Sequence, residues 1–255
     1  MSEEPILTET RDGVLIITIN RPEARNAVNG GVATGMAAAL DRLDGEDDLR
    51  VGIVTGAGGY FSAGMDLKAF VQGESPYAGD RGFAGITQRA SRKPLIAAIE
   101  GFALAGGFEV ALSCDLIVAS REARFGIPEV KRSLVAAGGA LLRLPRRIPY
   151  HLAMELALTG EPIGAERAYE LGVVNRLAEP GAALDMALEL AGAIVKNAPL
   201  ALIASKQIIE QSPEWSTEEI WAKQGEISGP VFTSEDAREG ATAFAEKREP
   251  VWRGR

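Results

Sequence analysis

Two glutamates and two glycine-rich loops contain the residue types that could do chemistry in this chain. The loops are residues 56–67 and 101–109, and each follows a predicted strand, which is where open α/β sheets place their ligands. The second loop opens a predicted helix, whose free N–H groups and positive dipole end favour a developing negative charge. The ordinary alternatives are a glycine turn in the first loop and close helix–sheet packing in the second.

The two glutamates are Glu109 and Glu129. Glu109 comes three residues after Gly106, so a helix places both on one face. Its apolar neighbours predict partial burial, which raises a carboxyl pKa toward values useful to a general acid or base. Glu129 follows Pro128 in an otherwise apolar segment. Either glutamate alone could be an ordinary solvated side chain, whereas the pair beside an anion-binding loop favours enolate chemistry.

The composition argues against several other functions, among them nucleic-acid binding, metal chemistry and serine hydrolysis. The chain has 255 residues with 27 basic and 35 acidic side chains, a net charge of −8, which argues against binding nucleic acid through the overall field. With His151 and Cys114 as the only histidine and cysteine, multi-histidine metal sites and zinc-finger ligand sets are excluded. We therefore expect no metal site. A Ser-His-Asp triad would have to use His151, and no G-x-S-x-G elbow occurs.

The sequence also carries expectations about location. No apolar run reaches the ~20 residues that span a bilayer, and the first residues lack the basic and apolar regions of a signal peptide. The single cysteine excludes an intramolecular disulfide. We therefore expect a cytoplasmic protein that does not bind a membrane.

The elements expected to position these residues alternate between strands and helices. Buried strands are predicted at 14–19, 51–55, 95–99 and 116–119, and the apolar spacing between 28 and 43 predicts a helix. Such alternation indicates parallel pairing with helical crossovers. After residue 138 only Val173-Val174 is predicted as a strand. Helices are expected near 184–195, 199–211, 215–228 and 234–248, so the chain divides into an α/β core over 1–190 and a helical part over 191–255.

Three segments resemble the crotonase (enoyl-CoA hydratase/isomerase) superfamily. They are F-S-A-G-M-D-L at 61–67, A-G-G-F-E at 105–109 and F-G-I-P-E at 125–129, and the likeness extends from residues 20–27 to 243–248. The resemblance implies a spiral of repeated ββα units with a helical C-terminal trimerisation part. It also implies trimers paired into hexamers, and acyl-CoA thioesters as substrates, with CoA as part of the substrate and no separate cofactor.

The resemblance assigns roles to individual residues. The backbone N–H groups of Met65 and Gly106 match the pair that holds the thioester oxygen. Glu109 and Glu129 match the two hydratase glutamates, one orienting or activating water and the other protonating Cα. The CoA-binding loops are matched by Ala24, Arg25, Ala27, Ala63, Asp66 and Leu67. Phe232 and Lys247 match C-terminal positions that reach CoA, often in a neighbouring subunit.

The chain departs from the family pattern at three places. Ala105 replaces the first glycine of the family's G-G-G-x-E, and little consequence for the anion hole is expected. Arg25 stands where lysine is common, which keeps the charge but not the geometry. Residues 131–139 lack the P-G-x-G-G form that shapes the acyl pocket in hydratases.

The family resemblance leaves three functions open. The leading one is an enoyl-CoA hydratase, which adds water reversibly and syn across a trans-2-enoyl-CoA to give a 3-hydroxyacyl-CoA. The second is an enoyl-CoA isomerase or another enzyme of acyl-CoA enolate chemistry. The third, from a different class, is an acyl-CoA-binding subunit without catalysis. The acyl-chain length and the balance of hydration against isomerisation stay open.

Overall fold

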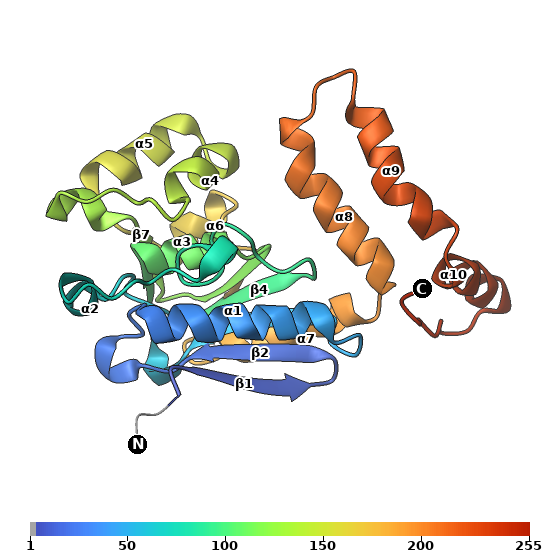
Figure 1. Cartoon of the computed structure of the whole chain (residues 1–255), viewed down its shortest axis with the longest axis horizontal. Coiled ribbons are helices and arrows are strands. Elements are labelled where there is room, and N and C mark those ends of the chain that lie inside the picture. The colour runs from blue at the N-terminus through green and yellow to red at the C-terminus, as the bar shows by residue number, and fades with distance from the viewer. Residues whose placement is uncertain (1–3) are drawn as a thin grey trace.

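The computed structural model describes residues 4–255 and contains a large mixed sheet (Figure 1). Its six strands run in the order β1-β2-β3-β4-β6-β9, with β1 antiparallel to β2 and the other neighbours parallel. The strands are β1 (Ile6–Arg11), β2 (Val14–Ile19), β3 (Val51–Gly56), β4 (Leu95–Ile99), β6 (Leu116–Ser120) and β9 (Arg176–Ala178). The predicted parallel pairing of the four central strands is confirmed.

A second, smaller sheet lies beside the start of the site-bearing helix α3 (Gly106–Leu112). It contains β5 (Phe102–Leu104), β7 (Arg124–Gly126) and β8 (Ile163–Gly164), in the order β5-β7-β8. The chain thus repeats two strands followed by a helix, as in β4–β5–α3 and β6–β7–α4, where α4 is Ala140–Arg147. The α/β class and this repeat agree with the expected fold.

The large sheet is buried on both faces. Leu15 and Ile17 of β2 pack toward α1 (Gly30–Gly45), whereas the alternate residues Val14 and Ile16 pack toward α7 (Ala183–Val195). This follows from the two-residue period of a strand. On α7 the buried residues are Ala183, Ala187 and Ala191, a stripe of small side chains at four-residue spacing that faces the sheet.

The remaining elements are short or lie at the surface. They are η1 (Pro22–Ala24), η2 (Ala57–Gly59), α2 (Leu67–Val71), η3 (Gly79–Arg81), η4 (Pro128–Arg132), α5 (Tyr150–Thr159), α6 (Ala165–Glu170) and η5 (Ser212–Glu214). In the described part of the chain no single helix is long and apolar enough to cross a membrane. One bent helix pair, Ala183–Val195 with Pro199–Glu214, meets that test by length and composition alone.

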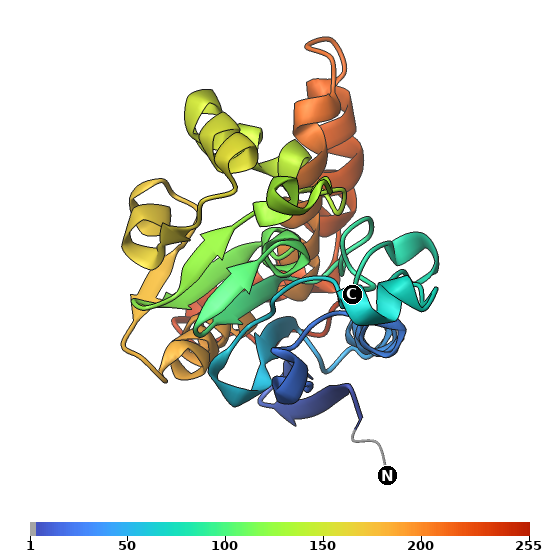
Figure 2. The ribbon, with the colours of Figure 1, turned by 90° about the vertical axis from the view of Figure 1, so that its left-hand side faces the viewer.

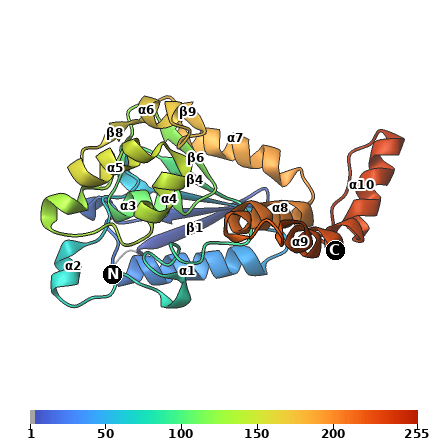
Figure 3. The same cartoon turned by 90° about the horizontal axis from the view of Figure 1, so that it is seen from above.

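The last three helices form an arm that projects from the core (Figures 1 and 3). They are α8 (Pro199–Gln211), α9 (Ile220–Phe232) and α10 (Glu235–Glu246). α8 and α9 pack against each other as an upright hairpin (Figure 2). The division expected near residue 190 lies inside α7, and the chain leaves the sheet only after that helix.

Two local predictions after residue 138 were wrong. Val173-Val174 is a buried loop, and the strand there is β9, which starts at Arg176; β8 was not predicted at all. The N–H groups of both valines donate to the Ala168 carbonyl and close helix α6, with Gly172 in the left-handed region at φ 79. Their apolar character therefore reflects core packing at a helix C-terminus. The helix expected at 215–228 is Ile220–Phe232.

Candidate active site

Three chain segments meet at the carboxyl ends of β3 and β4. These strands are parallel neighbours, so the loops that follow them leave the same edge of the sheet. Ser62 N–H donates to the Phe102 carbonyl at 3.1 Å, and Leu104 N–H donates to the Ser62 carbonyl at 3.0 Å. Val28 N–H donates to the Gly64 carbonyl at 2.7 Å. The first glycine-rich loop is therefore fixed to β5 on one side and to the segment before α1 on the other.

The two candidate N–H donors lie where these segments meet. Gly64 has φ 95, and a Cβ built on it would lie 2.8 Å from the Gly106 nitrogen. The left-handed backbone and this close approach both require glycine. Within residues 4–255, neither the Met65 N–H nor the Gly106 N–H donates a hydrogen bond. Free donors at one place fit a developing oxyanion.

Ala105, just before the Gly106 donor, is strained. Its backbone has φ 50 and ψ −130, a region that L side chains rarely adopt and glycine adopts readily. The ψ angle of Ala105 sets the orientation of the peptide that ends in Gly106 N–H. The alanine therefore keeps the glycine-type backbone, and the departure from the family triplet costs conformational free energy, which was not expected from the sequence.

We expect Ala105→Gly to stabilise the protein by about 1 kcal/mol, because relief of a positive-φ strain exceeds the entropy that glycine adds to the unfolded chain. Urea denaturation measures this. Ala78→Gly is the control, since Ala78 has an ordinary φ of −126 and the same change there is expected to destabilise. If Ala105→Gly and Ala78→Gly destabilise the protein equally, the Ala105 backbone is not strained.

Glu109 lies on α3 and is 4% exposed. Burial, and to a smaller extent the neighbouring Glu129, raises the pKa of Glu109 to about 7, against hydrogen bonds from the Ala140 and Gly138 N–H groups and the charge of Arg143. The Ala140 N–H donates to Oε1 at 3.1 Å. Near neutral pH this carboxyl therefore populates both protonation states, as a proton-transfer group must.

Glu129 lies in η4 and is half-buried. Burial raises the pKa of Glu129, partly opposed by its own backbone N–H and by Arg132. Its Oε2 atom is buried without a hydrogen-bond partner among the described residues. A buried carboxylate oxygen that lacks a partner is costly unless a ligand or water satisfies it. Glu129 is also close enough to Glu109 for its charge to affect it.

The raised pKa of Glu109 carries a stability prediction. The folded protein keeps this proton up to about pH 7, whereas the unfolded chain loses it near the ordinary glutamate value. Stability therefore falls as pH rises between these values. We expect Glu109→Gln, which cannot ionise, to exceed the wild type in unfolding free energy by roughly 1–3 kcal/mol at pH 8 and by little at pH 4. The exposed Glu23→Gln is the control, and a difference independent of pH would refute the burial argument.

The six loop residues expected to bind CoA lie in two connected segments beside the N–H pair. Ala63 N–H donates to the Arg25 carbonyl at 3.0 Å. Arg25 is exposed and left-handed at φ 53, and Leu67 is exposed at the start of α2. Ala24 is partly exposed and Ala27 is buried. The Asp66 carboxylate caps α2 through Lys68 and Ala69 N–H and pairs with Arg21 at 3.0 Å, so it holds this loop in place.

Two of the predicted site residues lie away from this edge within one chain. Phe232 ends α9 and is 80% exposed, and Lys247 follows α10 with φ 54. Both belong to the projecting arm, far from α2 and α3 in two perpendicular views (Figures 1 and 3). His151 is exposed on α5. Across residues 4–255 no group of three or more His, Cys, Asp or Glu side chains is arranged to hold a metal ion.

The sequence interpretation missed the turn that contacts Glu109. A Cβ on Gly138 would lie 2.5 Å from Glu109 Oε2, and one on Gly139 would lie 2.1 Å from an Arg143 nitrogen. Two consecutive glycines before a helix were the available signal, because such a pair permits close approach on both sides. Nothing in the pattern distinguished Arg143 from the other arginines of that helix.

Known proteins are similar to this chain along almost its whole length. The family model for "Enoyl-CoA hydratase/isomerase" matches residues 9–255. The enoyl-CoA hydratase EchA19 of Mycobacterium tuberculosis is 46% identical over 98% of this chain and 96% of its own. A carnitinyl-CoA dehydratase of Escherichia coli is 44% identical over 96% of this chain and 97% of its own. A crystal structure of an enoyl-CoA hydratase from M. tuberculosis H37Rv, 61% identical, superposes with a TM-score of 0.97 over 99% of this chain and 100% of that one.

Proposed function

Because this chain belongs to the enoyl-CoA hydratase/isomerase family, we propose that it adds water reversibly and syn across a trans-2-enoyl-CoA to give a 3-hydroxyacyl-CoA. One observation carries this proposal. Glu129, whose buried Oε2 has no hydrogen-bond partner among residues 4–255, lies close enough to Glu109 to raise its pKa, which is about 7. Both lie on the edge that bears the two N–H groups that donate no hydrogen bond within the same residues. The related hydratase and dehydratase names also describe gain or loss of water at a CoA thioester.

The chemistry follows from these groups. The thioester oxygen accepts hydrogen bonds from Met65 N–H and Gly106 N–H, and a water molecule lies between the two carboxyl groups. The ionised glutamate takes a proton from this water as its oxygen bonds to C3 and the C2–C3 π electrons move to the thioester enolate. The other glutamate, which is protonated from the start, then gives its own proton to C2, and the enolate electrons return to restore the carbonyl. The donors stabilise the negative charge where it develops.

A purified-protein assay tests the proposal directly. We expect enoyl-CoA esters to lose the absorbance of the conjugated thioester, with a 3-hydroxyacyl-CoA as product. Esters of graded acyl length, together with carnitinyl-CoA in the dehydration direction, would identify the acyl group. If 3-enoyl-CoA is converted to 2-enoyl-CoA while no water is added, the enzyme is an isomerase. Tight acyl-CoA binding with no conversion would identify a binding subunit.

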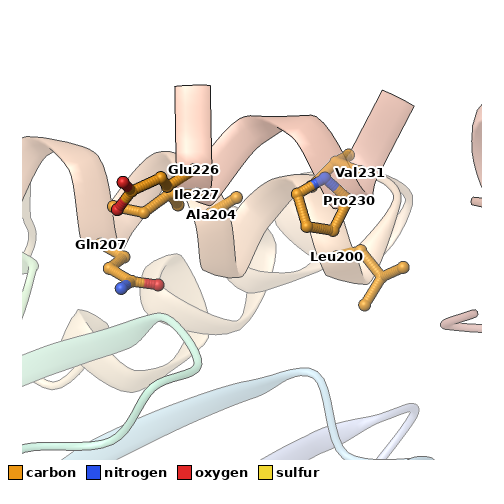
Figure 4. A pocket seen from close by; sticks show the side chains of 7 residues that line it. All are labelled: Leu200, Ala204, Gln207, Glu226, Ile227, Pro230 and Val231. Carbon is orange, nitrogen blue, oxygen red and sulfur yellow. The ribbon is translucent and has the colours of Figure 1, made fainter. Parts of the chain in front are cut away.

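We also propose that the arm assembles the chain into trimers or dimers of trimers. Its exposed aromatic side chains include Trp221, Phe232 and Phe244, which are 74%, 80% and 88% exposed. α8 and α9 border a groove of about 370 Å³ (Figure 4). It is lined by Leu200, Ala204, Gln207, Glu226, Ile227, Pro230 and Val231. Apolar surface of this kind favours contact with another protein surface.

In such an assembly Phe232 and Lys247 would reach the CoA of a neighbouring subunit. Light scattering at micromolar concentration tests the assembly, for which we expect three or six times the chain mass. A monomer would refute it and would remove both residues from the CoA site.

A further inference from the structure

Arg143 stands behind Glu109 and has no role in the chemistry above. It is half-buried on α4, and its guanidinium donates to backbone carbonyls: to Gly138 O at 3.2 Å and to Thr87 O at 2.6 Å. A half-buried arginine normally pairs with a carboxylate. One that instead binds two carbonyls from separate segments fixes the relative position of those segments.

One of the two segments is the turn that contacts Glu109. Gly138 lies against the carboxylate, with no room for a Cβ. Gly139 has φ 108, and a Cβ there would overlap the Arg143 guanidinium. The next residue, Ala140, donates its N–H to Glu109 Oε1. The Glu109 carboxylate and the Arg143 guanidinium therefore contact adjacent glycines of one turn. A shift of the guanidinium would move this turn and, with it, the Ala140 N–H that binds the carboxylate.

The second segment leads to the N–H pair. Thr87 N–H donates to the Phe83 carbonyl. The Phe83 ring lies against Gly106, where a Cβ would come within 2.5 Å of Phe83 Cζ. The Arg143 fork thus connects the two segments that pack on the proton-transfer group and on one oxyanion donor.

We propose that Arg143 is a positioning residue for Glu109, which holds the 138–140 turn so that Ala140 N–H meets the carboxylate. The inference rests on the proposed hydratase function. The charged and titratable groups around Arg143 are Glu109 on α3, Arg147 on α4, the Cys114 thiol and Glu210 on α8. Those around Glu109 are Glu129 and Arg143. The positive charge of Arg143 thus lowers the pKa of Glu109, whereas burial raises it.

Two variants separate the fork from the charge. Arg143→Gln removes both, and we expect kcat to fall ~10- to ~100-fold with KM within about threefold. We also expect the limb of the pH–rate profile that reports Glu109 to move to higher pH by roughly half a pH unit or more. Arg143→Lys keeps the charge but cannot bind two carbonyls as a planar fork. It should keep the pH profile and still lose kcat.

Arg146→Gln is the matched control on the same helix. Arg146 forms an exposed ion pair with Glu214 at 2.7 Å, and its loss should change little. If folded Arg143→Gln has the kcat and pH profile of Arg146→Gln, the proposal is wrong. If Arg143→Gln does not fold, Arg143→Lys decides, because wild-type kcat in that variant would overturn the need for the fork.

A measurement independent of turnover separates this inference from the proposed function. The stability difference that Glu109→Gln produces changes with pH as Glu109 titrates. In the Arg143→Gln background its midpoint should lie at higher pH than in the wild type and in Arg146→Gln. An unchanged midpoint would refute the positioning role even if wild-type protein hydrates no enoyl-CoA, whereas a shifted midpoint in inactive protein would count against the proposed function alone.

Discussion

Glu109→Gln and Glu129→Gln should each lower the hydration rate by ~10²–10⁴, the largest effect expected for any substitution in this chain. Glutamine keeps the size and the hydrogen-bonding oxygen of glutamate but cannot take or give the proton. The measurement is kcat for a 2-enoyl-CoA at saturating concentration. Binding of the CoA ester should change little by comparison, because the residues expected to bind CoA lie on a different part of the same edge.

The double variant sharpens this test. Two groups that act on one water molecule work as a unit, so removing both should cost little more than removing either one. Glu161→Gln is the matched control, because Glu161 is an exposed glutamate that pairs with Lys131 of η4 at 2.5 Å. It should keep wild-type turnover. Near-wild-type rates in both single variants would show that the two-glutamate mechanism is wrong for this chain.

We expect the ionised Glu109 side chain to lower the free energy of unfolding and, at the same time, to be required for turnover. Its burial raises its pKa to about 7, so ionisation at neutral pH is unfavourable to the fold. The same burial gives the proton-transfer group its working range. A single substitution, Glu109→Gln, is therefore expected to stabilise the protein above pH 7 and to inactivate it. That combination distinguishes a functional glutamate from one that only pairs within the core.

The sequence predicted the site where local rules apply. The loops after β3 and β4 had to meet because parallel strands end at one edge, and helical spacing placed Glu109 near Gly106. The approach of Glu129, Gly138 and Ala140 to Glu109 depends instead on how η4 and α4 pack over α3. No local period encodes that packing, so the role of the 138–140 turn and of Arg143 emerged only from the structure.

Other features that the sequence pattern did not predict depend on the backbone conformation. Ala105 reads as a harmless replacement in sequence, and only its φ of 50 reveals the strain. The valines at 173–174 fit a strand by composition, yet their N–H groups cap a helix. Phe232 and Lys247 lie on the projecting arm, away from the edge that bears the other predicted site residues, so their contact with CoA depends on the proposed assembly.

The second large effect is expected from the proposed oxyanion donors, the N–H groups of Met65 and Gly106. Gly64 is the position at which a substitution can test them. A Cβ on Gly106 itself would strike the buried Phe83 ring at 2.5 Å, which would confuse a lost donor with a disturbed core. A Cβ on Gly64 would instead lie 2.8 Å from Gly106 N and 3.0 Å from the Leu104 carbonyl. Gly64→Ala therefore places a methyl group against the Gly106 donor and against the Ala105 side chain, whose Cβ would also lie 2.8 Å away. We expect kcat to fall ~10²–10³, the usual cost of one oxyanion donor.

Gly59→Ala is the matched control, because Gly59 lies in the same loop with φ 78 and has open space where its Cβ would stand. Both variants carry the backbone strain of a positive φ, about 1 kcal/mol or more, but only Gly64→Ala reaches the donors. Folded Gly64→Ala with the turnover of Gly59→Ala would place the thioester oxygen elsewhere. A fall in kcat with acyl-CoA affinity retained would instead show that the N–H groups act mainly in the transition state. That result would separate an enzyme of enolate chemistry from a protein that only binds the ester.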